Sequence, residues 1–175
     1  MKNKIHHQYW TEQNHQDLKL AGSSLKDMLA VALDVVSRMP PHIHLVSGPI
    51  TTGGMGTIQE NLIVFRQTIE HLHEQEDLNI FSQIPFEVGM IEYHKQWSLN
   101  KSQFDYCWPI LHEFYGPLFA TKRFSVFHFI HGYEKSIGAC WEHEQCDVHG
   151  ISRRYLSYEF SFSLLSQHTL PQAPS

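Results

Sequence analysis

Glu142, on a predicted helix, is the residue best placed for chemistry in this sequence. It lies six residues after Ser136, whose hydroxyl can cap the first turn of that helix. At 100° per residue, Glu142 shares a helix face with the small residues Ala139 and Cys146 and with His149. We therefore expect its carboxylate to reach a pocket at the loop end of the helix, where it can act as a nucleophile or in proton transfer. The alternative is a solvated surface glutamate without a role.

A glycine-rich segment, residues 48–56, precedes another predicted helix and is a candidate anion-binding loop. It holds four glycines together with Thr51 and Thr52. Glycines let backbone amides approach an anion, and a helix N-terminus adds a positive partial charge. The segment is neither a P-loop nor a Gly-x-Gly-x-x-Gly dinucleotide loop, because both patterns are missing. An ordinary connecting loop without a ligand is the alternative.

The elements that must position these segments form a predicted βαβ unit. Residues 42–47 read as a short strand, and 79–81 as a second one. Between them, Thr57 and Glu60 form a capping-box pair ahead of a helix with apolar residues at spacings of three and four. A third strand over 124–130 precedes the helix that carries Glu142. The loops 48–56 and 131–138 thus follow strands of a mainly parallel sheet, at one edge of which they can meet.

The remaining segments complete a single predicted domain. We expect a polar lead-in over residues 1–22, then one helix that Ser24 opens and Pro40-Pro41 ends. Residues 86–100 read as irregular, 102–119 as a helix interrupted near Pro109, and 151–165 as a last strand. The predicted organisation is an extension with one helix (1–41), one α/β domain (42–165) and a tail (166–175).

Two motifs resemble those of a known family. The first is Leu45-Val46-Ser47-Gly48-Pro49-Ile50-Thr51, followed by Asn61 and Phe65; the second is Gly132-Tyr133-Glu134-Lys135-Ser136-x-Gly138-Ala139-x-x-Glu142-His143-Glu144. In this order and spacing they resemble the nucleoside 2-deoxyribosyltransferase-like superfamily over roughly residues 43–151. The most similar pattern is that of a bacterial and phage branch with Ala-Gly-Pro-Met-Thr-Gly and Gly-Trp-Glu-x-Ser-x-Gly-Ala-x-x-Glu motifs.

The resemblance implies a flavodoxin-like three-layer α/β sandwich that forms a homodimer or a larger oligomer. It also implies that Glu142, four residues after Gly138, is a nucleophile that attacks C1′ of a nucleoside or nucleotide and expels the base. A covalent glycosyl-enzyme results, and a second base or water resolves it, as in retaining glycosidases.

Substrate-binding residues follow from the same resemblance. Gly48, Ile50 and Thr51 match positions that line the sugar and phosphate side. A serine at the position of Ser136 helps bind the 5′-phosphate in nucleotide hydrolases of the family, whereas the deoxyribosyltransferases tend to have aspartate there, so a nucleoside 5′-monophosphate is favoured. The full implied substrate-binding set is Gly48, Ile50, Thr51, Tyr133, Ser136 and Gly138.

Some residues depart from the family pattern and keep a second hypothesis open. Many relatives carry an aspartate on the strand before the second motif, where this chain has Ser125, and Tyr133 replaces the usual tryptophan. The proton donor to the leaving base is then open among Glu134, Glu87 and a water molecule. A catalytically inactive nucleotide-binding or regulatory module is therefore the alternative to an enzyme, and an interaction protein that uses residues 86–122 is a third.

Composition excludes several other classes of protein. Thirteen Lys and Arg against eighteen Asp and Glu give a net charge of −5, which argues against binding to a nucleic acid polymer. The fourteen histidines show no His-Glu-x-x-His pattern, and the three cysteines form no metal or disulfide spacing, so we expect neither a metal nor another cofactor. Without a signal peptide or a membrane span, a reduced cytoplasmic location is predicted. Aromatic residues such as Phe104, Trp108 and Phe127 are assigned to the core or to a subunit interface.

Overall fold

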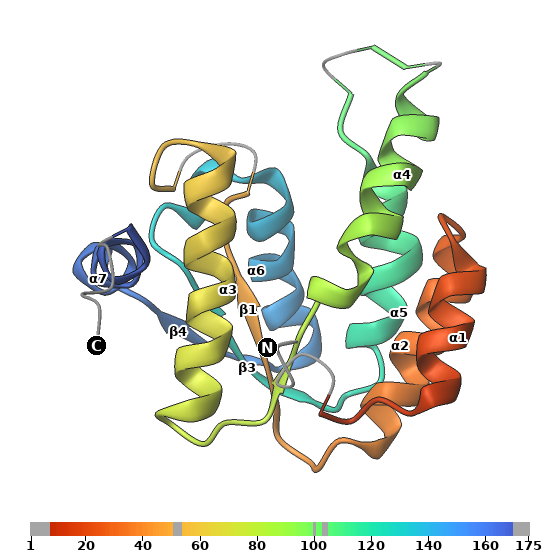
Figure 1. Cartoon of the computed structure of the whole chain (residues 1–175), viewed down its shortest axis with the longest axis horizontal. Helices are drawn as coiled ribbons and strands as arrows, with labels where there is room; N and C mark the ends of the chain where they lie inside the picture. Colours follow the sequence, from red (N-terminus) through yellow and green to blue (C-terminus); the bar gives the residue numbers. More distant parts are fainter. Residues whose placement is uncertain (1–7, 51–53, 100, 103–104, 170–175) are drawn as a thin grey trace, which may run out of the picture. The chain divides into compact units, whose positions relative to one another are not determined.

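The computed structural model describes residues 8–50, 54–99, 101–102 and 105–169 (Figure 1). Its contacts divide the chain into two compact units. The helical unit comprises Met1–Ile43 and Phe81–Phe124, and the α/β unit comprises His44–Ile80 and Ser125–Ser175. Each unit is therefore assembled from two separate stretches of sequence, whereas the sequence predicted one continuous domain from residue 42 after a short extension.

A four-stranded parallel sheet organises the α/β unit. Its strands are β1 (Ile43–Ser47), β2 (Ile80–Phe81), β3 (Phe124–Phe129) and β4 (Ser152–Tyr155), in the order β2-β1-β3-β4. Strands β3 and β4 are parallel, with Val126 opposite Ser152 and Phe129 opposite Tyr155. The strands at 42–47, 79–81 and 124–130 were predicted with errors of one residue or less at each end.

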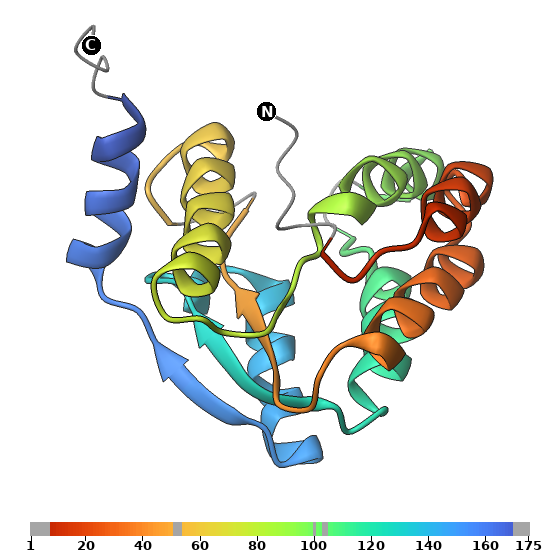
Figure 2. The same ribbon diagram turned by 60° about the horizontal axis from the view of Figure 1, so that its bottom comes forward.

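Helices cover both faces of this sheet (Figure 2). Helix α3 (Ile58–Glu74) links β1 to β2, and α6 (Ile137–His149) links β3 to β4 in the opposite direction along the sheet. Because parallel crossovers are right-handed, two connections that leave in opposite directions place their helices on opposite faces. Helix α7 (Tyr158–Thr169) packs against α3. The unit is thus the flavodoxin-like α/β sandwich that the sequence predicted.

Local sequence explains where α3 and α6 begin. Thr57 and Glu60 form the predicted capping box, in which each side chain accepts a hydrogen bond from the other residue's backbone N–H. Ser136 caps α6 by accepting a hydrogen bond from the N–H of Ala139. Gly150, in a left-handed conformation, ends α6 as expected.

The helical unit holds α1 (Glu12–Ala21), α2 (Leu25–Arg38), α4 (Glu87–Ser98), α5 (Gly116–Phe119), a π-helix (Ile110–Tyr115) and a short 3-10 helix (Ile84–Phe86). Helix α2 lies where Ser24 and Pro40 predicted it. A cluster of phenylalanine rings with centroids 5.3 to 6.1 Å apart forms part of its core: Phe81, Phe86, Phe114, Phe119 and Phe124.

The prediction of a single N-terminal helix was wrong, because α1 precedes α2. Polar contacts hold α1 in place: the buried Asn14 amide donates to Asp34 Oδ2 at 2.7 Å, and Arg38 donates to Asn14 Oδ1. Thr11 and Asn14 also form a reciprocal cap at its start. The spacing of apolar residues does not reveal α1, because the contacts that stabilise this helix come from polar residues.

Two further predictions in these stretches were wrong. Residues 86–100, predicted to be irregular, contain α4, which has no buried residue and therefore shows no apolar stripe. Residues 151–165, predicted as a strand region, hold the short β4 and then most of α7, so 166–169 belong to a helix and not to a tail. Phe104 lies outside the described residues, Phe127 is buried, and Trp108 is partly exposed.

None of the helices in the described parts of the chain combines the length and the apolar character that a bilayer crossing requires.

A pair of imidazoles lies across β1 and β3. His44 Nδ1 and His128 Nε2 are 2.8 Å apart, and their rings stack at 5.1 Å. His128 is fully buried, and its Nδ1 has no hydrogen-bond partner among the described residues. Burial, the neighbouring His44 and Arg154 lower the pKa of His128 to about 4, against a smaller opposing effect of Glu76.

Replacing His128 changes the pH dependence of stability. The unfolded chain binds a proton at His128 below its ordinary pKa of 6.5, whereas the folded chain does so only near 4, so His128 destabilises the fold progressively between these values. Relative to wild type, His128→Gln should gain about 2 kcal/mol in free energy of unfolding on going from pH 7 to pH 5. Urea titrations at both pH values measure this difference. The exposed His94→Gln serves as the control and should show no such gain.

Candidate functional site

The two predicted loops meet where neighbouring strands send their connections in opposite directions. Strands β1 and β3 are adjacent, and their helices α3 and α6 depart toward opposite edges of the sheet. The carboxyl ends of such strands form the crevice where α/β proteins bind ligands. The Ile130 N–H donates to the Ser47 carbonyl oxygen at 2.8 Å, so both loops start side by side.

Glycines allow these loops to approach closely. A Cβ atom on Gly48 would lie 2.8 Å from Ile130 Cβ, which no side-chain rotation can relieve. Gly132 has a left-handed φ of 81°, and a Cβ there would lie 3.2 Å from the Gly54 nitrogen. The expectation that loops 48–56 and 131–138 meet is therefore confirmed for their described residues.

The Glu142 carboxylate lies at this crevice, on the face of α6 that the sequence predicted. Ala139, Glu142 and Cys146 are the buried residues of α6. Glu142 is 8% exposed, and its Oε2 accepts a hydrogen bond of 2.5 Å from the hydroxyl of Ser47, the last residue of β1. No described residue hydrogen-bonds the other oxygen, Oε1. One carboxylate oxygen is thus held, while the other has no hydrogen-bond partner in the described parts of the chain.

Burial also changes the ionisation of Glu142. Desolvation raises its pKa to about 7, and the hydrogen bond from Ser47 acts in the opposite direction by stabilising the anion. Neither contribution comes from a neighbouring cation. A carboxyl group that titrates near neutral pH can serve as a nucleophile or as an acid-base group in the same pH range.

Asn61 of α3 holds the glycine loop from its other side. Its side-chain amide donates to the Ile50 carbonyl oxygen at 3.1 Å, and its Oδ1 accepts from the Met55 N–H at 2.7 Å. Asn61 is buried, and both hydrogen bonds are partly buried. Sequence reasoning noted Asn61 in the first motif but assigned it no role.

The other predicted binding residues occupy different places. Gly48 and Ile50 lie in the loop after β1, with Ile50 partly exposed, and Thr51 lies outside the described residues. Ser136 uses its hydroxyl oxygen as the cap of α6, and Gly138 lies in the first turn of that helix.

The Tyr133 ring packs in an aromatic cluster beside α6. It stacks on His143 at 5.3 Å and on Tyr155 at 5.8 Å, and it lies 4.8 Å from the Phe129 ring. His143 Nε2 and the Tyr155 hydroxyl are within hydrogen-bond distance at 2.8 Å. Tyr133 therefore anchors the loop after β3 onto β4 and α6.

The residues considered as proton donors belong to different elements. Glu134 is exposed in the short helix Tyr133–Lys135, whereas Glu87 begins α4 of the helical unit. Ser125, at the position where relatives have an acid, lies near the start of β3, and the crevice lies at the other end of that strand.

Metal and thiol chemistry find no support in the described residues. They contain no group of three or more His, Cys, Asp or Glu side chains that could hold a metal ion. Burial raises the pKa of the Cys140 thiol, with Glu134 and Glu144 adding to the effect, and raises that of Cys146 to about 12. Both thiols therefore remain protonated near neutral pH.

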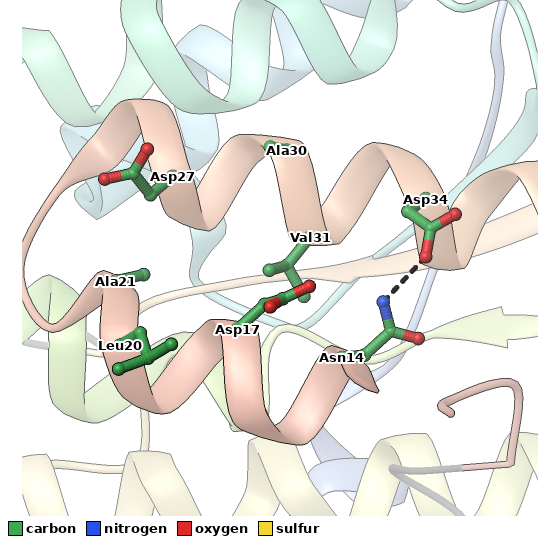
Figure 3. Close-up of a pocket in the computed structure, with 8 residues that line it drawn as sticks. All are labelled: Asn14, Asp17, Leu20, Ala21, Asp27, Ala30, Val31 and Asp34. Carbon is green, nitrogen blue, oxygen red and sulfur yellow. Dashed lines mark hydrogen bonds between the residues drawn. The ribbon is translucent and has the colours of Figure 1, made fainter. Parts of the chain in front are cut away.

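A cavity of about 360 Å³ lies between α1 and α2 of the helical unit (Figure 3). Its lining combines Asp17, Asp27 and Asp34 with small apolar side chains. Asp34 already accepts hydrogen bonds from Asn14 and Arg38, which together lower its pKa. These hydrogen bonds join α1 to α2, so we assign Asn14 and Asp34 of this cavity a structural role.

Comparison with known proteins leaves the site to be interpreted from its geometry, since no protein-family model, curated protein or solved structure matches this chain.

Ser47 was absent from the predicted site residues, although a signal for it exists in the sequence. Strand residues alternate between faces, so Ser47 shares a face with Ile43 and Leu45, which are both buried. A polar residue at the end of such an apolar row indicates a specific partner, because a buried hydroxyl needs a hydrogen bond.

Neutralising Glu142 should stabilise the fold in a pH-dependent way. The folded chain keeps the Glu142 proton up to about pH 7, whereas the unfolded chain releases it near 4.5, so the wild type loses stability as pH rises between these values. Glu142→Gln should therefore gain about 2 kcal/mol more over wild type at pH 8 than at pH 5. Urea unfolding at both pH values tests this, and the exposed Glu144→Gln on the same helix should show no pH-dependent gain.

Removing the Asn61 side chain should loosen the glycine loop. Asn61→Ala deletes two hydrogen bonds and leaves the Ile50 carbonyl and the Met55 amide without these partners, for an expected loss of about 2 kcal/mol in unfolding free energy. Limited proteolysis should show faster cleavage between residues 50 and 56. Gln59→Ala removes an exposed amide from the same helix and should leave both properties unchanged; equal effects in the two variants would contradict the role of Asn61.

Proposed function

We propose that this protein cleaves the N-glycosidic bond of a nucleoside or nucleoside 5′-monophosphate through a covalent glycosyl intermediate on Glu142. The observation that carries the proposal is the buried Glu142 carboxylate at the carboxyl end of β1, with Oε2 bound by Ser47 and Oε1 bound by none of the residues that the structure describes. The resemblance of both loop motifs to the deoxyribosyltransferase-like family supports the same assignment.

The chemistry fits a two-step displacement. Oε1 attacks C1′ of the sugar, and the C1′–O bond forms while the C1′–N bond breaks. The base leaves with the electron pair of that bond and takes up a proton from solvent. In the second step, water or the nitrogen of another base attacks C1′ and releases the carboxylate. The first acceptor gives hydrolysis and the second gives transfer.

Burial suits Glu142 to this role. The transition state at C1′ resembles an oxocarbenium ion, and a nearby carboxylate stabilises that charge more strongly in a water-poor site than in bulk water. The adjoining loop after β1 and the N-terminus of α6 supply backbone N–H groups on the side where a 5′-phosphate would bind. Ser136 and Gly48 would contact that part of the substrate.

Base release from a panel of nucleosides, deoxynucleosides and their 5′-monophosphates tests the proposal. With chromatographic detection, wild type should release free base from one substrate class, with and without an acceptor base. Glu142→Gln and Glu142→Ala should lower the rate by at least about 1,000-fold, because the covalent step is lost. Glu144→Gln should retain the wild-type rate.

The rate should also rise with pH through about 7, because attack requires the ionised carboxylate of Glu142. A rate that falls over this range would instead assign Glu142 as a proton donor. Absence of base release from the whole panel, together with a thermal shift on nucleotide binding, would favour the catalytically inactive nucleotide-binding module.

A further inference from the structure

Ser47 is the polar residue of the α/β unit that contacts Glu142 directly. It ends β1 and is 1% exposed, and its hydroxyl points toward α6 from the opposite side of the interface. The two residues lie 95 positions apart in the sequence, so only the packing of α6 on β1 brings them together.

The direction of this hydrogen bond depends on the charge of Glu142. An ionised carboxylate only accepts hydrogen bonds, so the Ser47 hydroxyl must donate to it. A hydroxyl that donates to an ionised carboxylate forms a stronger hydrogen bond than one that donates to a neutral acid. The contact therefore stabilises the anion more than the neutral acid.

No cation among the described residues forms an ion pair with Glu142. On β4, Arg153 forms an ion pair of 2.7 Å with Asp147 and also donates to the His143 carbonyl oxygen. On this face, β1 carries Ile43, Leu45 and Ser47, and β3 carries Ser125, Phe127 and Phe129, so neither strand brings a charged side chain to it. The other titratable side chains of α6 and of the short helix before it are Tyr133, Glu134, Lys135, Cys140, His143, Glu144, Cys146, Asp147 and His149. Ser47 is thus the group that contacts the carboxylate and favours its charged form.

We propose that Ser47 is a positioning residue: its hydroxyl holds Oε2, favours the ionised form of Glu142 over the neutral one, and leaves Oε1 as the oxygen that attacks the substrate. The role of Oε1 as the attacking atom rests on the proposed function. The stabilisation of the Glu142 anion by the Ser47 hydroxyl does not depend on any activity. The hydroxyl also fixes the χ angles of a flexible glutamate, which reduces the entropy lost on reaching the attacking geometry.

The test follows the Glu142 carboxyl group by ¹³C NMR during a pH titration of the full chain labelled at glutamate. Ser47→Ala should raise the titration midpoint of Glu142 by about one pH unit, because the anion loses its donor. Ser47→Thr keeps the hydroxyl and should restore the wild-type midpoint. Ser47→Cys replaces the hydroxyl with a weaker donor of similar size and should give an intermediate titration midpoint. This variant replaces Ser47→Ala in the test if the alanine variant does not fold.

Kinetics provide the second measurement. In the base-release assay, Ser47→Ala should lower kcat about tenfold with little change in KM, and should move the acidic limb of the pH profile upward with the NMR midpoint. Ser47→Thr should recover most of the rate. Ser161→Ala removes a buried hydroxyl from α7, far along the chain from the site, and should change neither the midpoint nor the profile.

The two proposals fail in different ways. An unchanged Glu142 midpoint in Ser47→Ala would overturn the role of Ser47, whatever the activity. Absence of base release from wild type would overturn the proposed function, while a raised midpoint in the same preparation would still support the hold of Ser47 on the anion.

Discussion

The Glu142 carboxyl group lies between α6 and the end of β1 with one hydrogen-bond donor, Ser47, to offset its loss of water. Desolvating a charged carboxylate costs several kcal/mol, and a single hydroxyl recovers only part of that cost. The α/β unit must therefore be held together by its other contacts, chiefly the buried rows of β1 and β3 and the packing of α3 and α7. The buried Glu142 carboxyl group therefore lowers the free energy of unfolding, as groups at functional sites commonly do.

The arrangement of the sheet places this buried group at the end of β1. Strands β1 and β3 are neighbours with crossovers in opposite directions, and α/β proteins commonly bind ligands at the carboxyl ends of such strands. Close approach at Gly48 and Gly132 brings the two loops together, and Asn61 ties the first loop to α3. Strand order, two glycines and one amide thus bring both loops and the Glu142 carboxylate to the same edge of the sheet.

Most of the sandwich was predictable because its signals are local. The capping box at Thr57, the cap at Ser136 and the C-terminal Gly150 each depend on residues within one helical turn, and all three were correct. Helices α1, α4 and α7 were missed, the first two for a common reason. Polar contacts, such as that of Asn14 with Asp34, stabilise α1, while α4 buries no residue, so neither presents the apolar periodicity on which a prediction depends.

By itself, the sequence determined the strands β1 and β3, the helices beside them and the helix face that carries Glu142, since short-range periodicity and capping fix these features. The tertiary structure alone decided that Ser47 meets Glu142 across 95 residues, that burial brings the pKa of this carboxyl group to about 7, and that residues 81–124 pack with the N-terminal helices. These features depend on which surfaces exclude water together, and desolvation is a property of the packed assembly of elements and not of any one segment.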